Sequence, residues 1–342
     1  FGLGVSAAMV FGFIALMFLD TSINMAMQPF KMLVGDMVNE RQKGLAYSIQ
    51  SFLCNAGSLV GYLAPLVLTA IGVSNLAPQG QVPQSVTWSF YIGAGVLLLC
   101  VGYSFITIRE MPPAEYARFH GIEDSDKKES QPKSEANIFK LLANAPATFW
   151  SVGLVQFFCW SAFLYMWTYT NGAIAQTVWN TSDPASAAYQ EAGNWVGTLF
   201  AVQAIGSVLW AIVIPMFKSH KFIYSLSLLI GGAGFISTLY IHDQYMLFVS
   251  YLLIGCAWAA MLALPFTILT NSLSGRNLGA YMGLFNGTIC LPQIIAALLG
   301  GVILKALGGA QVNMLVAAGV LLLIGAVAVW FVRETYGERT AN

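Results

Sequence analysis

The sequence is poor in charge. Lysine, arginine, aspartate and glutamate make up only 9% of the 342 residues, and the 15 basic and 15 acidic residues cancel. In soluble domains about a quarter of the residues are charged, so the composition argues against an ordinary soluble domain. No basic excess indicates nucleic acid as a partner. With 57% hydrophobic residues and a mean hydropathy of +0.70, the sequence predicts a chain embedded in a lipid bilayer.

Patterns of catalytic or metal-binding residues are also missing from the sequence. The five cysteines all fall inside apolar runs without Cys-x-x-Cys or cysteine–histidine spacing, so neither a disulfide framework nor a metal site is indicated. No apolar run contains the nucleophile–base pair or metal ligands that a membrane-embedded enzyme needs, and no soluble sensor domain is appended. We therefore predict no enzymatic activity and no cofactor. Because residue 1 is Phe and no signal peptide precedes it, we expect the sequence to begin within a longer protein.

Long apolar runs are what the sequence has in abundance. Nine of them are long enough to cross about 30 Å of hydrocarbon. They lie near residues 3–33, 45–72, 87–108, 147–170, 194–217, 222–241, 245–270, 279–304 and 313–332. The sequence therefore predicts an all-α transmembrane protein with about nine spans.

The connections between these runs alternate in charge. Fourteen of the fifteen basic residues fall on one side, and Lys305 is the exception. By the positive-inside rule the basic side is cytoplasmic. We therefore expect a multi-pass protein of the cell (inner or plasma) membrane with a cytoplasmic C-terminus.

Two segments of the sequence resemble each other. Residues 29–52 and 265–285 both begin with Pro-Phe, keep a leucine four places on (Leu33 and Leu269), and cross a polar turn. Chance similarity between two apolar stretches is the alternative. The copies are six spans apart in the same orientation, which is the relation between the two halves of a major facilitator transporter. On that count the chain holds helices 4 to 12 of a twelve-helix carrier, and three helices precede Phe1.

This count divides the chain into four parts. Residues 1–108 are the remainder of an N-terminal helical half (helices 4–6), and residues 146–333 are a C-terminal six-helix half (helices 7–12). Residues 109–145, which are polar and contain proline, form a central cytoplasmic linker. Residues 334–342 form a cytoplasmic tail.

The first apolar run contains a polar stripe. Asp20, Asn24, Gln28 and Lys31 stand at i, i+4, i+8 and i+11, so they share one face of a helix. An ionised carboxylate deep in a bilayer costs roughly 3 kcal/mol, and a partner or protonation lowers that cost. Asp20 is therefore either a proton or substrate site, or one part of a hydrogen-bonded polar clamp between helices.

The same residues carry a resemblance to a known family. LDTSINMAMQPFKMLVGDM (19–37) resembles the fourth helix of the sucrose transporters and of the related solute carrier 45 and glycoside–pentoside–hexuronide cation symporters. GAYMGLFNGTICLPQIIAAL (279–298) is similar to their eleventh helix. The resemblance implies a major facilitator fold and a proton-coupled sugar carrier. It implies that Asp20 binds the coupling proton and touches the sugar, with Asn24 beside it.

Charged residues at the first basic turn suggest a gate. Lys31, Asp36 and Arg41 could form an ion-pair latch that closes the cytoplasmic side, and a solvated loop is the alternative. Four further side chains are candidate sugar contacts, because amides bind hydroxyl groups and aromatic rings pack on the C–H faces of sugars. They are Gln50, Gln156, Trp160 and Asn286.

Each of these candidates has an alternative role. An amide in a span also bridges helices, at a gain of about 0.6–2 kcal/mol. Trp and Tyr near the end of a span ordinarily form an interfacial belt, and this is the interpretation favoured for Trp167, Tyr169 and Asn171.

The sequence as a whole predicts a secondary active transporter. We expect proton-coupled symport of a glycoside or disaccharide, resembling sucrose or maltose, by alternating access of two helical halves. The expected partners are a small-molecule sugar, a proton and the lipid bilayer, and the expected state is a monomer. A sodium-coupled or exporting carrier of another small solute on the same fold is the alternative.

Overall fold

A computed structural model describes residues 7–37, 40–76, 82–109, 112, 115, 138–272 and 278–332. The regular structure within these residues is entirely helical. By contacts the chain forms two compact units. The first comprises residues 1–54 and 98–134, and the second comprises residues 55–97 and 135–342. The expected division into a half of residues 1–108 and a half of residues 146–333 stays a prediction.

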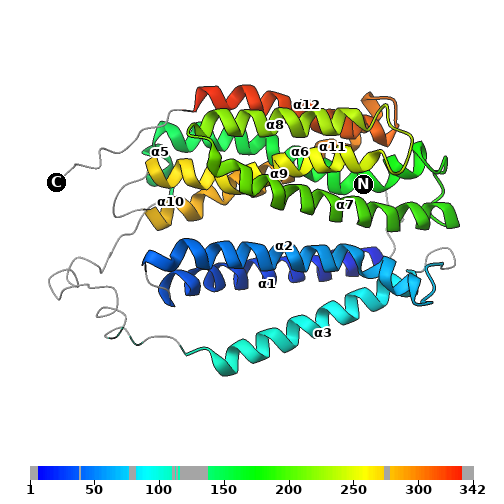
Figure 1. Cartoon of the computed structure of the whole chain (residues 1–342), viewed down its shortest axis with the longest axis horizontal. Coiled ribbons are helices and arrows are strands. Elements are labelled where there is room, and N and C mark those ends of the chain that lie inside the picture. The colour runs from blue at the N-terminus through cyan, green and yellow to red at the C-terminus, as the bar shows by residue number, and fades with distance from the viewer. Residues whose placement is uncertain are drawn as a thin grey trace. The chain divides into compact units, whose positions relative to one another are not determined.

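Three long helices make up the N-terminal third of the chain (Figure 1). They are α1 (Ala7–Met37), α2 (Glu40–Ala70) and α3 (Gln84–Thr107). Asp20 and the other members of the polar stripe therefore lie on one continuous helix, at the spacing that puts them on one face.

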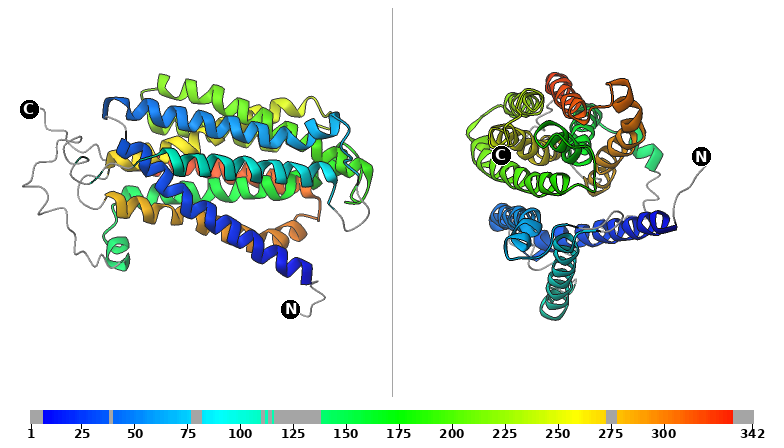
Figure 2. Two further views of the ribbon diagram at one scale, coloured as in Figure 1. Left: turned by 90° about the horizontal axis from the view of Figure 1, so that it is seen from below. Right: turned by 90° about the vertical axis from the view of Figure 1, so that its right-hand side faces the viewer.

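The second unit is a bundle of helices that run side by side (Figures 1 and 2). A short helix, α5 (Ile138–Ala143), leads into α6 (Ala147–Thr177). The helices that follow are α7 (Ala187–Val213) with η1 (Ile214–Met216), α8 (His220–Ser237), α9 (Leu247–Ser272), α10 (Leu278–Phe285), α11 (Gly287–Ala306), and α12 (Gln311–Ala328) with η2 (Val329–Phe331). In this bundle α6 packs against α7, α9, α11 and α12, which makes it the central helix.

Each predicted span coincides with a helix, except that the run at 279–304 is divided between α10 and α11. Six helices among the described residues are long and apolar enough to cross a membrane, and two shorter apolar helices cover Val10–Ile23 and Ala56–Ala70. The predicted all-α transmembrane fold is confirmed.

Local capping explains where the helices begin and end. Ser186 accepts a hydrogen bond from the Tyr189 backbone N–H, and so starts α7 seven residues before the predicted apolar run. Gly308 and Gly309 end α11 with positive φ angles of 86° and 80°, which a residue with a Cβ adopts only under strain. Helix ends therefore follow caps and turns rather than the limits of hydrophobicity.

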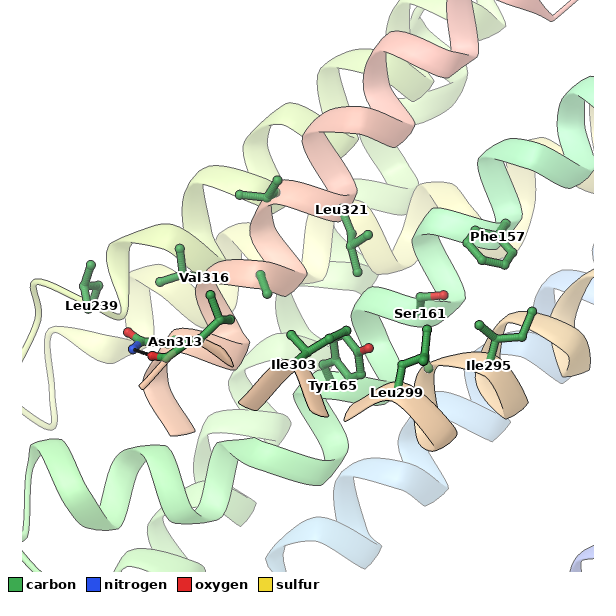
Figure 3. A pocket seen from close by; sticks show the side chains of 14 residues that line it. Phe157, Ser161, Tyr165, Leu239, Ile295, Leu299, Ile303, Asn313, Val316 and Leu321 are labelled. Carbon is green, nitrogen blue, oxygen red and sulfur yellow. Dashed lines mark hydrogen bonds between the residues drawn. The ribbon is translucent and has the colours of Figure 1, made fainter. Parts of the chain in front are cut away.

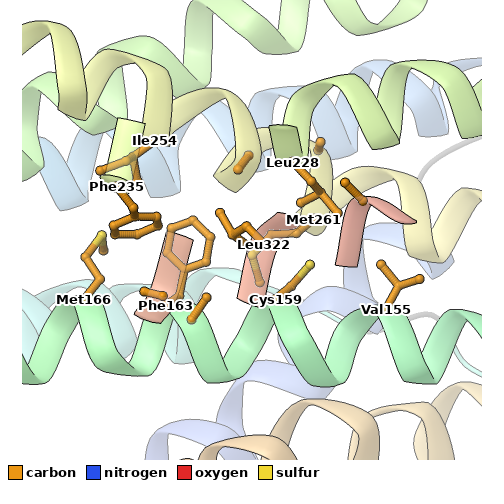
Figure 4. Close-up of a cluster of buried hydrophobic side chains, with 14 of the residues drawn as sticks. Val155, Cys159, Phe163, Met166, Leu228, Phe235, Ile254, Met261 and Leu322 are labelled. Atoms are coloured by element: carbon orange, nitrogen blue, oxygen red, sulfur yellow. The ribbon is translucent and has the colours of Figure 1, made fainter. Parts of the chain in front are cut away.

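The core of the second unit lies where α6, α8, α9 and α12 meet (Figure 4). Cys159, Phe163, Phe235, Met261 and Leu322 are all fully buried there. The rings of Phe163 and Phe235 form an edge-to-face pair with centroids 5.8 Å apart. This packing fixes one face of α6 and leaves its other faces to different neighbours.

Glycines allow α7 and α9 to approach each other closely. A Cβ on Gly206 of α7 would lie 2.6 Å from the Leu252 carbonyl oxygen of α9, and Gly255 of α9 lies equally tightly on Gln203 of α7. Small residues at such crossings are typical of membrane helix pairs, because tight backbone contact replaces the missing hydrophobic driving force.

Candidate functional site

Five side chains of α6 share one face of that helix. They are Gln156, Trp160, Phe163, Trp167 and Asn171, at i, i+4, i+7, i+11 and i+15. With about 3.6 residues per turn, these positions fall on a single stripe that runs along most of the helix. We call this set the α6 stripe. It combines two amides and two indoles in a helix that is otherwise largely apolar.

The α6 stripe holds buried polar atoms without a hydrogen-bond partner. Within the described residues these are both side-chain polar atoms of Gln156, the indole Nε1 of Trp160 and the Oδ1 of Asn171. Gln156 is completely buried. Leaving a buried polar group unpaired costs about 1–3 kcal/mol, so a partner that supplies hydrogen bonds is expected at this face.

Aromatic rings cluster at the middle of the α6 stripe, between Gln156 and Asn171. Trp258 of α9 packs against three of its members, with centroid distances of 5.9 Å to Trp160, 5.6 Å to Trp167 and 4.9 Å to Phe163. Trp160 and Trp167 also pack together at 6.4 Å. Three indoles from two helices therefore meet beside the unpaired amide of Gln156, one turn from Trp160.

The other end of the α6 stripe borders α7 and α9. A Cβ on Gly193 of α7 would lie 3.5 Å from the Oδ1 of Asn171. Thr170, next to it in α6, accepts a hydrogen bond of 3.3 Å from the Tyr251 hydroxyl of α9. Two polar regions are thus separated by the aromatic cluster along one helix.

Of the predicted sugar contacts, the structure brings Gln156 and Trp160 together. Asn286 lies at the break between α10 and α11, where the backbone N–H groups of Ile289 and Cys290 donate to its carbonyl oxygen. The Asn286 side chain is exposed, so it does not share the buried environment of Gln156. A break within a transmembrane helix is nevertheless a feature that transporters use at binding sites.

The remaining predicted residues belong to α1 and α2. The Asp20 side chain is exposed on α1, and its neighbours Thr21 and Ser22 donate to the carbonyl oxygens of the preceding turn at 2.7 Å each. Side chains at five predicted positions lie outside the described part of the chain; they are Asn24, Lys31, Asp36, Arg41 and Gln50.

Sequence reasoning missed three members of this site. Trp258 was not singled out, and Trp167 and Asn171 were interpreted as parts of an interfacial belt. The buried Oδ1 of Asn171 and the packing of Trp167 on Trp160 and Trp258 connect both residues to the α6 stripe. The Trp167 side chain is 38% exposed, and the interfacial belt stays a prediction. The signal that would have found the two on α6 is their helical spacing from Gln156, the same rule that identified the stripe at Asp20.

The fold and the site together define a class of protein. A bundle of membrane-length helices with buried, unpaired polar side chains facing inward is typical of membrane carriers. A family model described as the Major Facilitator Superfamily matches residues 169–342, which are 174 of the 342 residues. The chain belongs to the Major Facilitator Superfamily. It is therefore a multi-pass integral membrane protein and a secondary transporter of small solutes, not an enzyme.

A solved structure supports the same fold. The chain is similar to a bacterial homolog of the human lysosomal transporter Spinster, whose crystal structure shows an inward-facing and occupied conformation. The two chains are 19% identical with a TM-score of 0.54, over 89% of this chain and 72% of the other. At this identity the likeness concerns the fold alone. No match was found among curated protein sequences.

Proposed function

We propose that this transporter carries a glycoside or disaccharide by proton-coupled symport, and that the α6 stripe holds the sugar. The observation that carries the proposal is the set of four buried, unpaired polar atoms on Gln156, Trp160 and Asn171. A sugar presents many hydroxyl groups, each of which donates and accepts, so it can satisfy amide oxygen, amide nitrogen and indole N–H together.

The aromatic cluster supports the same class of solute. Sugars also present apolar C–H faces, and the rings of Trp160, Trp167 and Trp258 offer a flat apolar surface beside the unpaired amide. Small-molecule sites are ordinarily lined by large aromatic surfaces with a few polar groups. The resemblance of residues 19–37 to the sucrose transporter group points to the same solute.

Proton coupling rests on Asp20. A carboxylate that alternates between protonated and ionised forms can link proton binding to sugar binding, and a membrane potential of about 100 mV supplies roughly 2.3 kcal/mol per proton. In this proposal Asn24, Gln50 and Asn286 add sugar contacts, and Lys31, Asp36 and Arg41 form the cytoplasmic gate. The division into two halves and the cytoplasmic C-terminus belong to the same proposal.

The experiment is transport into sealed vesicles that contain the full-length protein. Sucrose or maltose is added outside, and external pH is recorded for the native protein, Asp20→Asn and Gln156→Leu. We expect alkalinisation with the native protein and none with Asp20→Asn. For Gln156→Leu we expect a weaker response at low sugar concentration, because the variant removes a sugar contact and leaves the proton site intact.

Two results would overturn parts of the proposal separately. If neither sugar moves protons but labelled sugar still accumulates with a sodium gradient, the sodium-coupled alternative replaces proton coupling. If no glycoside is bound, the solute class is wrong. Binding is followed by intrinsic fluorescence, since the three clustered indoles at the site should report a bound sugar. A sugar titration of Gln156→Leu with the same midpoint as that of the native protein would remove the α6 stripe from the binding site.

A further inference from the structure

A cavity lies on a face of α6 that differs from the α6 stripe. It occupies about 540 Å³ between α6, α11 and α12 (Figure 3). Phe157, Ser161 and Tyr165 of α6 line it, and none of them belongs to the α6 stripe. In Figure 3 Asn313 and Leu239 lie at one end of the cavity, with Phe157 and Ile295 at the other. The cavity is therefore elongated along the helices.

The packing of the three helices explains why this space exists. Helix α11 is held against α6, where Ser161 donates to the Pro292 carbonyl oxygen at 3.5 Å and Gly300 meets the Tyr169 hydroxyl. Helix α12 instead packs on α6 and α8. Ala296 of α11 and Ala317 of α12 line the cavity with only a methyl group each, so the space between the two helices is not filled by side chains.

The lining is almost entirely apolar. Eleven of the fourteen lining residues are aliphatic or phenylalanine, and the other three are Ser161, Tyr165 and Asn313. Ser161 already donates to Pro292, and the Asn313 side-chain N–H donates to the Leu307 carbonyl oxygen at 2.7 Å. A water molecule needs two to four polar partners to occupy a buried site, so the lining favours an apolar occupant.

The cavity opens onto an exposed apolar surface of the bundle. Two of its lining residues, Leu299 of α11 and Val320 of α12, are 48% and 45% exposed. Next to Leu299, Leu298 is 75% exposed, and Val302 on the same helix is 66% exposed. In a multi-pass membrane protein, such exposed aliphatic side chains face the hydrocarbon of the bilayer.

From these observations we propose that the cavity holds one acyl chain of a bilayer lipid. The dimensions agree, because the lining runs along α11 from Ile295 to Leu307, the residue that follows the end of the helix, over about 18 Å at 1.5 Å per residue. One leaflet contributes half of a hydrocarbon core of about 30 Å. The Asn313 side-chain amide, which donates to the Leu307 carbonyl oxygen, lies at the end of the cavity nearest the turn between α11 and α12. The polar part of the lipid emerges at this end. This site is independent of the sugar site on the α6 stripe.

The test uses the full-length protein in bilayer nanodiscs made with a phospholipid that carries a photoreactive diazirine on one acyl chain. After illumination, labelled residues are mapped by mass spectrometry. We expect labelling concentrated on cavity residues such as Leu299 and Val316, above that of the simply lipid-exposed Leu298. Ala317→Phe fills part of the cavity and should lower the labelling of cavity residues to that of the simply lipid-exposed Leu298.

Two matched variants keep the test decisive. Val302→Phe adds the same bulk on the lipid-facing side of α11 and should leave cavity labelling unchanged. Ala296→Leu fills the cavity from the other helix and replaces Ala317→Phe if that variant fails to fold. Cavity labelling no higher than that of Leu298, or unaffected by filling, would overturn the proposal.

Discussion

Replacing Gln156 by Leu separates a binding role from a structural role by the sign of its effect on stability. Gln156 is completely buried, and within the described residues neither of its side-chain polar atoms has a partner. Leu has nearly the same volume and removes both atoms. If the amide serves a solute, the solute-free protein carries an uncompensated cost of about 1–3 kcal/mol per unpaired group, and Gln156→Leu relieves it.

A matched control lies on the same helix. Gln176 is a glutamine of α6 whose Oε1 accepts a hydrogen bond of 3.1 Å from the backbone N–H of Gln311, at the start of α12. Gln176→Leu leaves that N–H unpaired and should destabilise the protein by about 1–3 kcal/mol. The two Gln→Leu variants are therefore expected to shift stability in opposite directions.

The assay is thermal unfolding of the purified full-length protein in one detergent at one scan rate, because membrane protein unfolding is commonly irreversible. About 2–4 °C per kcal/mol is expected for a unit of this size. Gln156→Leu should raise the unfolding temperature without sugar and lose the increase that sugar gives the native protein. A decrease as large as that of Gln176→Leu would show that Gln156 bridges helices, and the reasoning from unpaired atoms would fail.

Three further outcomes test single contacts. Trp160→Phe keeps an aromatic ring and removes the buried, unpaired N–H, so the free energy of sugar binding should weaken by about 1–3 kcal/mol in a titration. Trp167→Phe loses no such group and should bind sugar nearly as the native protein does. Gly197→Ala brings a Cβ to 2.5 Å from a carbonyl oxygen of α2, so it should lower the free energy of unfolding by about 1–3 kcal/mol and lower the unfolding temperature. Gly61→Ala, with open space around it, should change neither. Ser225→Ala removes the acceptor of the Trp330 indole N–H, at 3.2 Å, and the donor to Ala326, at 2.9 Å; a loss of about 1–2 kcal/mol is expected by the same measurement, and an unchanged unfolding temperature would contradict it.

The fold was largely predictable from the sequence because a bilayer demands long apolar segments with internally satisfied backbones. Each of the nine predicted runs therefore coincides with helical residues. Helix ends were less predictable. Helix α6 continues to Thr177 past a predicted limit of residue 170, because a buried helix continues through residues such as Asn171 when neighbouring helices cover them.

The break between α10 and α11 could also not be predicted from hydropathy. The run at 279–304 is apolar on average, yet the α-helix is interrupted at Asn286. Asn and Gly have low helix propensity, and Pro292 removes a backbone donor one and a half turns later. Local chemistry of this kind decides where a span bends, while hydropathy decides only that it crosses.

The candidate site was half predictable for a related reason. Helix α6 contacts different surroundings on different sides: the core of α8, α9 and α12, which the α6 stripe borders at Phe163, the apolar cavity beside α11, and the unpaired amides of the α6 stripe. Two of those faces are apolar, so average hydrophobicity does not reveal the third. Gln156 and Trp160 could be predicted as sugar contacts because they are polar or amphipathic residues deep in a span. Trp258 belongs to the site because α9 packs against α6. A helix with several neighbours can thus bind a solute on one face and a lipid on another, since different side chains line the two, and substitutions at Gln156 and Ala317 should have independent effects.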